Sequence, residues 1–484
     1  MATANPNVLL VVLDSVRARN TSLHGYRRET TPRLDAFADR ATTYRQARAP
    51  GIHSLASHAS IFSGAHVAAH GLTSHGAQID PGRTVWADLA DRGYDTGFFT
   101  PNAVVTRSSN FGDAFDTVVG PKERQSAPFP DALSPSTVEN INDTSYVDYL
   151  RLSLTSGRPI RSLVNGAAEL AYDRLDRFAV DESGATYVPE FLDWHADRSG
   201  PWAACLNLMD AHYPYVPDDE HDRWGGSYLQ RLHRETRGPY STTFLSGEYL
   251  WKLRAFEALY DGAIRQADAH VDRLLGALRE RGELDDTLVV VTSDHGEGFG
   301  EPSELEPTVE LVDHSWGISE EVTHVPLVVK YPGQTEGRTV DRPATLTRFP
   351  AVVRAAVDGE GAAEADATDG DRSFAPDGPV LVSTERVTSP SEELPDACPN
   401  PERYAGPWRA VYEWRDGAVW KFSRRGDSAL TQVIPNALER QVIERDEDVT
   451  SEVFDAIEPD PTVAAGNRDL DADVQSHLKE LGYL

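Results

Sequence analysis

Residues 287–301 read TLVVVTSDHGEGFGE, an apolar run that turns abruptly into polar residues and glycines. The run is short and rich in β-branched residues, which is typical of a strand buried on both faces of a parallel sheet. Asp294 and His295 follow it, and Gly296 and Gly298 allow the backbone to turn tightly. Adjacent carboxylate and imidazole groups can bind one divalent metal ion, so we predict a metal site here. The alternative is a hydrogen-bonded pair in an ordinary turn.

Two further predicted strands end in the same way. Residues 7–18 (NVLLVVLDSVRA) turn polar at Asp14, and residues 208–215 (LMDAHYPY) place Asp210 and His212 after an apolar run. The carboxyl ends of parallel strands lie along one edge of a sheet, where such folds place their sites. We therefore expect these side chains to lie near one another. The alternatives are that Asp14 caps a turn or a helix, and that His212 only packs.

Strands and helices alternate over the first two thirds of the chain, and residues 248–281 form a long amphipathic helix. This order predicts an α/β fold, with a mostly parallel central sheet and helices on both of its faces. After an acidic segment at 357–378, the sequence indicates antiparallel strands joined by tight turns. We divide the chain into a catalytic domain at 1–335, with an insertion at 121–180, and a smaller C-terminal α+β subdomain at 336–484.

The charge of the chain excludes some partners. Asp and Glu number 77 against 46 Lys and Arg, a net charge of −31, and only five of the basic residues are lysine. This balance argues against nucleic acid or an anionic membrane, and it is typical of a cytosol kept at high salt. No apolar run reaches the roughly 18–20 residues that span a membrane, and the first residues do not resemble a secretion signal. We expect a cytoplasmic, halophilic protein.

A serine-rich stretch, PGIHSLASHASIFSG at 50–64, has a helical spacing that begins near Ser54. A hydroxyl at the start of a helix lies beside unpaired backbone N–H groups, which favour anions. His58 lies four residues further on, on the same face. A serine near a metal ion can ionise and attack phosphorus or sulfur, so Ser54 is a candidate nucleophile. Alternatively, Ser54 only caps the helix, and His314 in LVDHSWG (311–317) is structural rather than a ligand.

Taken together, these motifs resemble the sulfatase family of the alkaline phosphatase superfamily. The resemblance covers about residues 5–335 and rests on motifs that occur in the family's order: NVLLVVLDSVRA, TPRLDAFADRA, HGL, RGYDT, MDAHYPYVP, VVVTSDHGEGFGE and HVPLVVKYPG. It implies an alkaline phosphatase-like fold, a divalent metal ion and a nucleophile on the short helix. Counting back from Ser63-Gly64, the nucleophile falls at Ser54.

The resemblance also implies the residues of the site. One divalent ion (Ca²⁺, Mg²⁺, Mn²⁺ or Zn²⁺) is bound by four residues, one of which is the nucleophile Ser54: Asp14, Ser54, Asp294 and His295. In relatives that bind two metals an Asp and two His hold the second ion, and the matching residues here are Asp210, His212 and His314. The anion is bound, or the leaving group protonated, by three histidines: His58, His212 and His314.

The chain departs from the sulfatase pattern at positions that bear on the reaction. His58 stands where the sulfatase motif has arginine. The enzyme that converts a residue such as Ser54 to formylglycine reads this motif, and here the motif is incomplete. Ser15 replaces the second Asp of an N-terminal pair, residues 100–102 replace a Lys-x-His that grips sulfate, and His314 stands where many sulfatases have lysine. These departures favour relatives that use an unmodified serine or threonine on phosphorus.

We therefore expect a metal-dependent, sulfatase-like hydrolase that cleaves a sulfate or phosphate ester through a serine-derived nucleophile, with formylglycine at Ser54 as one form of it. The substrate is an anionic ester of a glycan or a small molecule, and neither nucleic acid nor a membrane is a partner. The first alternative is a phosphodiesterase or phospho-group transferase that uses unmodified Ser54 with one or two metal ions. The second is a non-catalytic binding protein, which bound metal would argue against. The sequence predicts no oligomeric state.

Overall fold

The computed structural model divides the chain into two compact units, Met1–Gly120 with Ser183–Leu484 (unit 1) and Pro121–Glu182 (unit 2). The structure describes the following residues: 5–121, 128–129, 131–134, 146–175, 183–236, 244, 250–359, 372–384, 400–443, 448–468 and 470. Unit 2 spans nearly the residues of the predicted insertion. The predicted boundary near residue 335 stays a prediction, because the residues on both sides of it belong to unit 1.

The largest sheet of unit 1 has eight strands. Across the sheet their order is β11 (Arg338–Thr345), β2 (Thr42–Arg48), β10 (Leu327–Lys330), β7 (Thr287–Thr292), β1 (Asn7–Leu13), β6 (Trp202–Leu208), β4 (Asp95–Phe99) and β5 (Thr117–Val119). All neighbours pair in parallel except that β10 runs antiparallel to both β2 and β7. The apolar strands β1 and β7 therefore lie at the centre of the sheet, as their sequences predict.

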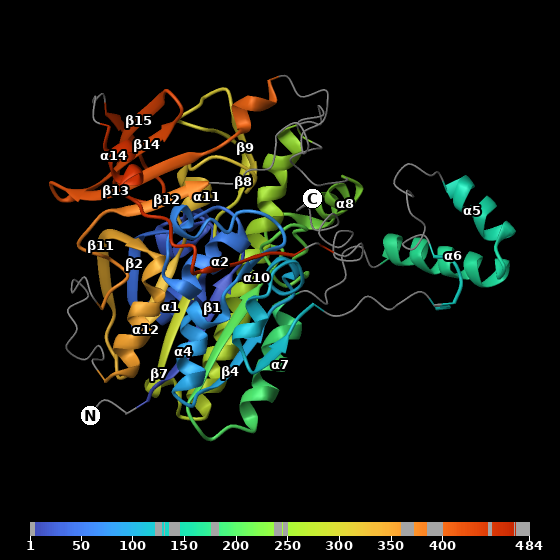
Figure 1. Cartoon of the computed structure of the whole chain (residues 1–484), viewed down its shortest axis with the longest axis horizontal. Coiled ribbons are helices and arrows are strands. Elements are labelled where there is room, and N and C mark those ends of the chain that lie inside the picture. The colour runs from blue at the N-terminus through green and yellow to red at the C-terminus, as the bar shows by residue number, and fades with distance from the viewer. Residues whose placement is uncertain are drawn as a thin grey trace. The chain divides into compact units, whose positions relative to one another are not determined.

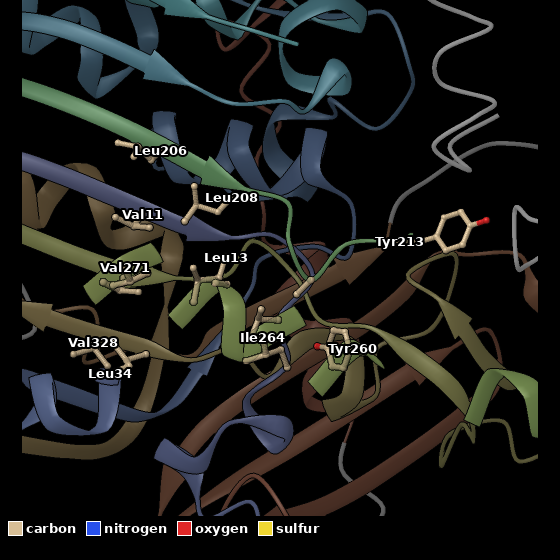
Figure 2. Packing of buried hydrophobic residues seen from close by; sticks show 14 of the residues in the cluster. Val11, Leu13, Leu34, Leu206, Leu208, Tyr213, Tyr260, Ile264, Val271 and Val328 are labelled. Carbon is tan, nitrogen blue, oxygen red and sulfur yellow. The ribbon is translucent and has the colours of Figure 1, made fainter. Parts of the chain in front are cut away.

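Helices pack on both faces of this sheet (Figure 1). One face packs against α1 (Pro32–Ala38), α7 (Gly184–Ala196) and α10 (Leu250–Glu280). The other packs against α2 (Ser54–Ser63), α4 (Val85–Asp91) and α12 (Phe349–Val357). Because side chains alternate along a strand, Val11 of β1 joins the first cluster and Val12 the second. Figure 2 shows the first cluster, where Val11 and Leu13 lie near Ile264 and Val271 of α10.

Further helices in the described part of unit 1 include α3 (Val67–His70), α8 (Gly226–Glu235), α11 (Glu320–Thr323), α14 (Val449–Asp455) and a π-helical turn at Val104–Ser108. Unit 2 contains the helical pair α5 (Tyr146–Thr155) and α6 (Pro159–Leu175), in which the Tyr149 hydroxyl donates to the Ser162 carbonyl at 2.6 Å. No helix in the described ranges is both long and apolar enough to cross a membrane.

A second, antiparallel sheet follows in the C-terminal part of unit 1, in orange and red in Figure 1. Its strands, in order, are β12 (Val380–Thr384), β13 (Trp408–Arg415), β14 (Ala418–Arg425), β15 (Ser428–Ile434) and β16 (Gln441–Ile443). Two small sheets pair β17 (Ala464–Asn467) with β3 (Ala77–Ile79), and β8 (Gly298–Pro302) with β9 (Glu310–Asp313). The predicted fold class, a mostly parallel α/β sheet followed by antiparallel strands, is confirmed.

Candidate active site

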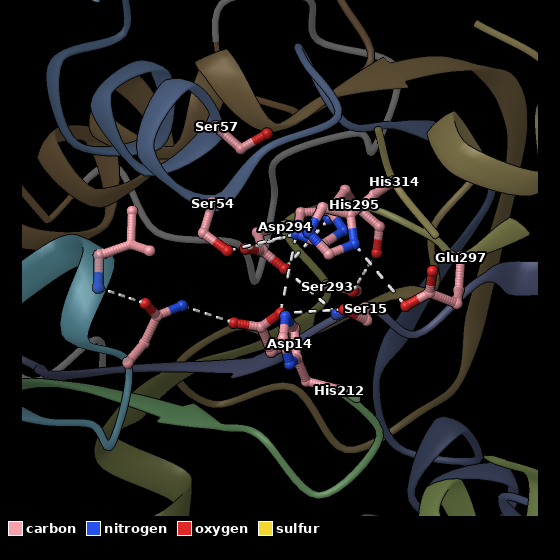
Figure 3. A network of polar contacts seen from close by, with 12 residues as sticks. Asp14, Ser15, Ser54, Ser57, His212, Ser293, Asp294, His295, Glu297 and His314 are labelled. Carbon is pink, nitrogen blue, oxygen red and sulfur yellow. Dashed lines mark hydrogen bonds and ion pairs between the residues drawn. The ribbon is translucent and has the colours of Figure 1, made fainter. Parts of the chain in front are cut away.

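The polar residues that follow the central strands meet at one edge of the main sheet (Figure 3). Asp14 directly follows β1, and Asp294 comes two residues after β7, which is a parallel neighbour of β1. Asn207 lies near the end of β6, the other parallel neighbour. Neighbouring parallel strands end side by side, so these three side chains converge although they lie at positions 14, 207 and 294 of the chain.

Asp14 is fully buried and fixed by polar neighbours. Its Oδ2 accepts hydrogen bonds from Asn102 Nδ2 at 3.0 Å and from Asn207 Nδ2 at 3.1 Å, and its Oδ1 accepts from Ser15 Oγ at 3.2 Å. Burial alone would raise the pKa of this carboxyl, but His212, His295 and the hydrogen bond from Asn207 lower it to about 2. Asp14 is therefore a carboxylate in a defined orientation.

Ser54 and His295 contact each other at the centre of the site. Ser54 Oγ lies 3.2 Å from His295 Nε2. The Nδ1 of His295 lies 2.9 Å from the carbonyl of Gly296, so Nδ1 carries the proton and Nε2 presents a lone pair. That Nε2 is also 3.5 Å from Asp294 Oδ2 and 3.7 Å from Asp14 Oδ1. Burial lowers the pKa of His295, which favours the neutral ring that a metal needs as a ligand.

The group of Asp14, Asp294 and His295 fits a divalent metal ion. Their ligand atoms lie within 4.8 Å of one another, and all three side chains are buried. Asp294 Oδ2 is buried and has no hydrogen-bond partner among the described residues, which is costly for a carboxylate unless a cation binds there. Two oxygen donors and one imidazole nitrogen suit several divalent ions. An ion held here would lie beside the Ser54 hydroxyl.

Helix α2 positions the predicted nucleophile. It begins at Ser54, and Gly64 ends it in the left-handed conformation, with φ 83°. His58 lies one turn further on, where its Nδ1 is 2.8 Å from the Ser54 carbonyl and 3.6 Å from Asp294 Oδ2. Both residues are buried, and the His58 ring packs edge-on against Phe62. The structure therefore places Ser54 and His58 beside the candidate metal ligands.

His212 and His314 lie on the other side of this group. Their ring centroids are 5.4 Å apart, and the rings of His314 and His295 are 4.2 Å apart. His314 Nδ1 lies 2.8 Å from Asp313 Oδ1 and 3.7 Å from Glu297 Oε2. Burial alone would lower the pKa of His314, but Asp313 and Glu297 raise it well above its usual value. These two carboxyl groups therefore favour the protonated form of His314 at the edge of the site.

Asp210 does not join the histidines with which the sequence groups it. Its Oδ1 accepts from Gln266 Nε2 at 2.8 Å and lies 3.4 Å from His270 Nε2. Its Oδ2 accepts from the Gly184 backbone N–H at 2.9 Å. The carboxylates beside His314 are instead Glu297 and Asp313, and the three form a second group whose ligand atoms lie within 4.8 Å of one another.

The sequence did not single out four polar residues of this site: Asn102, Asn207, Glu297 and Asp313. Asn207 carries a readable signal, because it is the one polar residue in the apolar run WAACLNL. Asp313 stands out only in the structure, where its backbone is left-handed with φ 60°, a conformation that is uncommon outside glycine. Burial and the nearby Asp313 raise the pKa of Glu297 to about 8.

Comparison with known proteins identifies the class. The profile of the family called Sulfatase matches residues 6–357. The chain therefore belongs to the sulfatase family, whose members hydrolyse sulfate and phosphate esters, and the predicted family is confirmed. Its relatives include an N-acetylglucosamine-6-O-sulfatase of Bacteroides thetaiotaomicron, 30% identical over 132 residues, which are 26% of this chain and 21% of that relative. An arylsulfatase of Clostridium perfringens is 24% identical over 68% of this chain and 69% of its own length.

Solved structures agree on the fold. The phosphonate monoester hydrolase of Agrobacterium radiobacter is similar with a TM-score of 0.58, at 17% identity over 89% of each chain. A protein solved in complex with its substrate D-glucosamine-2-N,6-O-disulfate gives a TM-score of 0.57, at 14% identity over 99% of this chain and 98% of that one. At such low identity the likeness supports the fold and leaves the substrate open.

Proposed function

We propose that the protein is a metal-dependent hydrolase of sulfate or phosphate esters in which Ser54 supplies the nucleophile. The observation that carries this proposal is the 3.2 Å contact between Ser54 Oγ and His295 Nε2, within the buried group that also contains Asp14 and Asp294. A divalent ion bound by these residues would lower the pKa of the hydroxyl and stabilise charge on the ester oxygens. Membership of the sulfatase family supports the same reaction class.

The reaction proceeds in two steps. With an unmodified serine, Ser54 Oγ transfers its proton to solvent water and attacks the sulfur or phosphorus, and the bond to the bridging ester oxygen breaks with its electron pair on that oxygen. His314, whose Nδ1 lies 2.8 Å from Asp313 Oδ1, binds the anion or donates the proton that the leaving oxygen takes up. Water then attacks the ester formed on Ser54, which releases sulfate or phosphate and restores the serine.

A paired assay tests this proposal. Purified protein is treated with chelator, reloaded with Ca²⁺, Mg²⁺, Mn²⁺ or Zn²⁺, and assayed at high salt with aryl sulfate, phosphate monoester and phosphodiester. We expect turnover of one ester class that depends on metal and falls by about 10³-fold or more in Ser54→Ala, because the nucleophile is lost. Ser63→Ala, at the other end of the same helix, is the matched control and keeps the activity.

Mass spectrometry of the peptide that contains Ser54 decides which form of the nucleophile acts. A loss of about 2 Da from serine, the two hydrogens removed on oxidation to an aldehyde, would establish formylglycine and sulfatase chemistry. An unmodified serine together with phosphate ester turnover would establish direct attack by the hydroxyl. Full activity in Ser54→Ala, or full activity without metal, would contradict the proposal in both forms.

A second candidate is a phosphodiesterase or phospho-group transferase that uses unmodified Ser54. The position of Asn102 favours it, because this residue holds Asp14 in the part of the chain where the sulfatase pattern has a Lys-x-His that grips sulfate. His58 in place of the sulfatase arginine favours it too. Transfer of the phospho group to an added alcohol, measured as a second phosphate ester among the products, distinguishes a transferase from a hydrolase.

The substrate and the setting are also part of the proposal. Relatives named as an N-acetylglucosamine-6-O-sulfatase and an ulvan-active sulfatase support an anionic ester of a glycan or of a small molecule. The net charge of −31 and the scarcity of lysine support work in a cytosol at high salt, without nucleic acid or membrane as a partner.

A further inference from the structure

Helix α11 holds the turn that follows His295. The backbone N–H groups of Gly296 and Glu297 donate to the carbonyls of Val322 and Glu321, each at 3.0 Å. A Cβ at Gly296 would clash with the Glu321 carbonyl oxygen, so glycine is what lets the turn and the helix approach this closely. The Nδ1 of His295 in turn lies 2.9 Å from the Gly296 carbonyl. A shift of α11 would therefore rotate the ring of a candidate metal ligand.

Lys421, on strand β14 of the C-terminal sheet, anchors the start of this helix. Its Nζ donates to the Ile318 carbonyl at 2.7 Å and to Glu320 Oε1 at 3.0 Å. Glu320 is the first residue of α11, and Ile318 lies four residues after His314. One ammonium group thus holds both the segment that carries His314 and the helix that supports the turn after His295.

The two neighbouring strands hold the same segment. Tyr412 of β13 is the register partner of Lys421, and its hydroxyl donates to Glu320 Oε1 at 2.8 Å. Thr384 of β12 donates from its Oγ1 to the Gly317 carbonyl at 3.2 Å. Three adjacent strands of the C-terminal sheet therefore each extend one polar side chain to the segment between His314 and α11 or to the first residue of that helix.

The ion pair at the centre of these contacts is buried. Glu320 Oε2 also lies 2.7 Å from Arg48 Nη2, and the side chains of Arg48, Glu320 and Lys421 are at most 3% exposed. Burial alone would raise the pKa of Glu320, but Arg48 and Lys421 hold it well below its usual value. Removing such charges from water costs about as much as their attraction returns, so the pair adds little net stability. What it supplies is hydrogen bonds of fixed direction.

We propose that Lys421 is a positioning residue of the active site. Through Ile318 and Glu320 it fixes the orientation of His295 and His314, and so it sets how tightly the site binds its metal ion. The inference rests on the proposed function, to which that metal ion belongs. It makes the C-terminal sheet a working part of the site, although the sheet supplies none of the candidate metal ligands.

The first test measures metal binding in Lys421→Met. Methionine keeps an unbranched side chain of similar length and removes the charge and the N–H donors. We expect the Kd for the ion to rise by about 10-fold, because the ring of His295 loses its fixed orientation. Calorimetric titration of Mn²⁺, and in a second series Ca²⁺, into metal-free protein measures the Kd without any assay of activity.

Lys330→Met is the matched control. Lys330 is also a buried lysine beside a carboxylate, with its Nζ 3.3 Å from Asp285 Oδ1. It lies at the end of β10 away from the site, because Leu327, at the other end of that strand, is the residue that pairs with Thr292. Its Kd should stay within about 2-fold of wild type. A wild-type Kd in folded Lys421→Met, or an equal rise in both lysine variants, would overturn the inference.

A milder variant covers the case in which Lys421→Met does not fold. Tyr412→Phe keeps the buried ring and removes only the hydroxyl that donates to Glu320. We expect its Kd to rise by about 2- to 5-fold, the effect of one lost hydrogen bond. The near-ultraviolet circular dichroism spectrum shows whether each variant is folded. A wild-type Kd in folded Tyr412→Phe would then decide against the inference.

The part assigned to His314 has its own measurement. At saturating metal, kcat/KM should still fall by about 10-fold in Lys421→Met, because the segment that carries His314 has lost its anchor. Lys330→Met should keep the wild-type value. A wild-type kcat/KM in Lys421→Met would overturn the effect on His314.

These outcomes are separate from those that test the chemistry. Turnover through Ser54 together with a wild-type Kd in Lys421→Met would leave the proposed function standing and overturn only the positioning role. Wild-type protein that binds metal but cleaves no ester would contradict the proposed reaction, while the comparison of Kd values still decides the role of Lys421. Wild-type protein that binds no divalent ion would contradict both.

Discussion

At the scale of single residues, two asparagines determine how Asp14 can act. Asn102 and Asn207 both donate to the same carboxylate oxygen, Oδ2, and leave Oδ1 facing His295. Hydrogen bonds of this kind orient a metal ligand and set its basicity. The two asparagines therefore act on the predicted metal through Asp14 rather than by contacting it.

Replacing Asn207 tests this positioning role. In Asn207→Ala we expect the Kd for the divalent ion to rise by about 10- to 100-fold, because Asp14 loses a hydrogen bond that fixes its orientation. A titration in competition with a metal chelator measures this change without any assay of activity. Asn110→Ala, whose side chain bonds the backbone at Ile79, is the control and keeps the wild-type Kd. Unchanged metal affinity in Asn207→Ala would contradict the role.

The sequence predicted the residues whose signal is local. Asp14, Asp294 and His295 each follow an apolar strand, and the structure brings them together with Ser54. It did not predict where Asp210 points, because Asp210 follows strand β6 while its partners Gln266 and His270 lie 56 and 60 residues further along the chain, on helix α10. A pairing of that kind depends on how a helix packs, which no local pattern records.

At the scale of elements, helix α10 supports the start of helix α1 with a buried carboxylate. Asp268 of α10 accepts hydrogen bonds from the backbone N–H groups of Leu34 at 2.8 Å and Arg33 at 3.1 Å. These N–H groups belong to the first turn of α1 and have no partner within their own helix. Burial nevertheless raises the pKa of Asp268 from 3.8 to about 6.

This raised pKa predicts a pH dependence of stability. The folded protein binds the proton of Asp268 more tightly than the unfolded chain does. The stabilisation that this proton gives the folded state is therefore complete below about pH 4 and is lost as the pH rises through 6. As the pH rises from about 4.5 to 7.5, the unfolding free energy of Asp268→Asn should increase by about 2 kcal/mol relative to that of wild type. Denaturant unfolding at a series of pH values measures the difference.

The control for this measurement is Asp272→Asn, one turn further along α10. The side chain of Asp272 is 54% exposed, so burial acts little on its charge. The unfolding free energy of Asp272→Asn relative to wild type should change by less than about 0.5 kcal/mol over the same pH range. A difference between Asp268→Asn and wild type that does not vary with pH would refute the assigned cause.

The packing of elements also separates what the sequence could predict from what it could not. Periodicity predicted a helix at 248–281 and gave no sign of which of its residues would pair with α1 or with Asp210. The order of strands in the main sheet shows the same limit. β10 lies between β2 and β7 and runs against both, a direction that its apolar sequence does not encode.

At the scale of the whole molecule, net charge is the dominant feature. The net charge is −31, so the excess negative side chains repel one another across the surface. Salt screens that repulsion over a Debye length of roughly 10 Å at 0.1 M and roughly 3 Å at 1 M. We therefore expect the Tm to rise by roughly 10 °C or more between 0.1 M and 2 M KCl. Differential scanning calorimetry measures this shift.

Sucrose at the same osmolarity is the comparison for the salt experiment. It is excluded from protein surfaces but screens no charge, so the rise in Tm should be clearly smaller than in KCl. Equal shifts in the two solutes, or a Tm that is independent of KCl, would argue against adaptation to high salt.

Ser383 and Thr384, at the end of β12, lie outside the part of the chain that the family profile covers, which ends at residue 357. The metal ligands and Ser54 all lie inside it. Strand β12 thus brings residues from beyond the profile to a pocket that Ser54 also lines. A substitution after residue 357 can therefore reshape the surroundings of Ser54 and leave every candidate metal ligand unchanged.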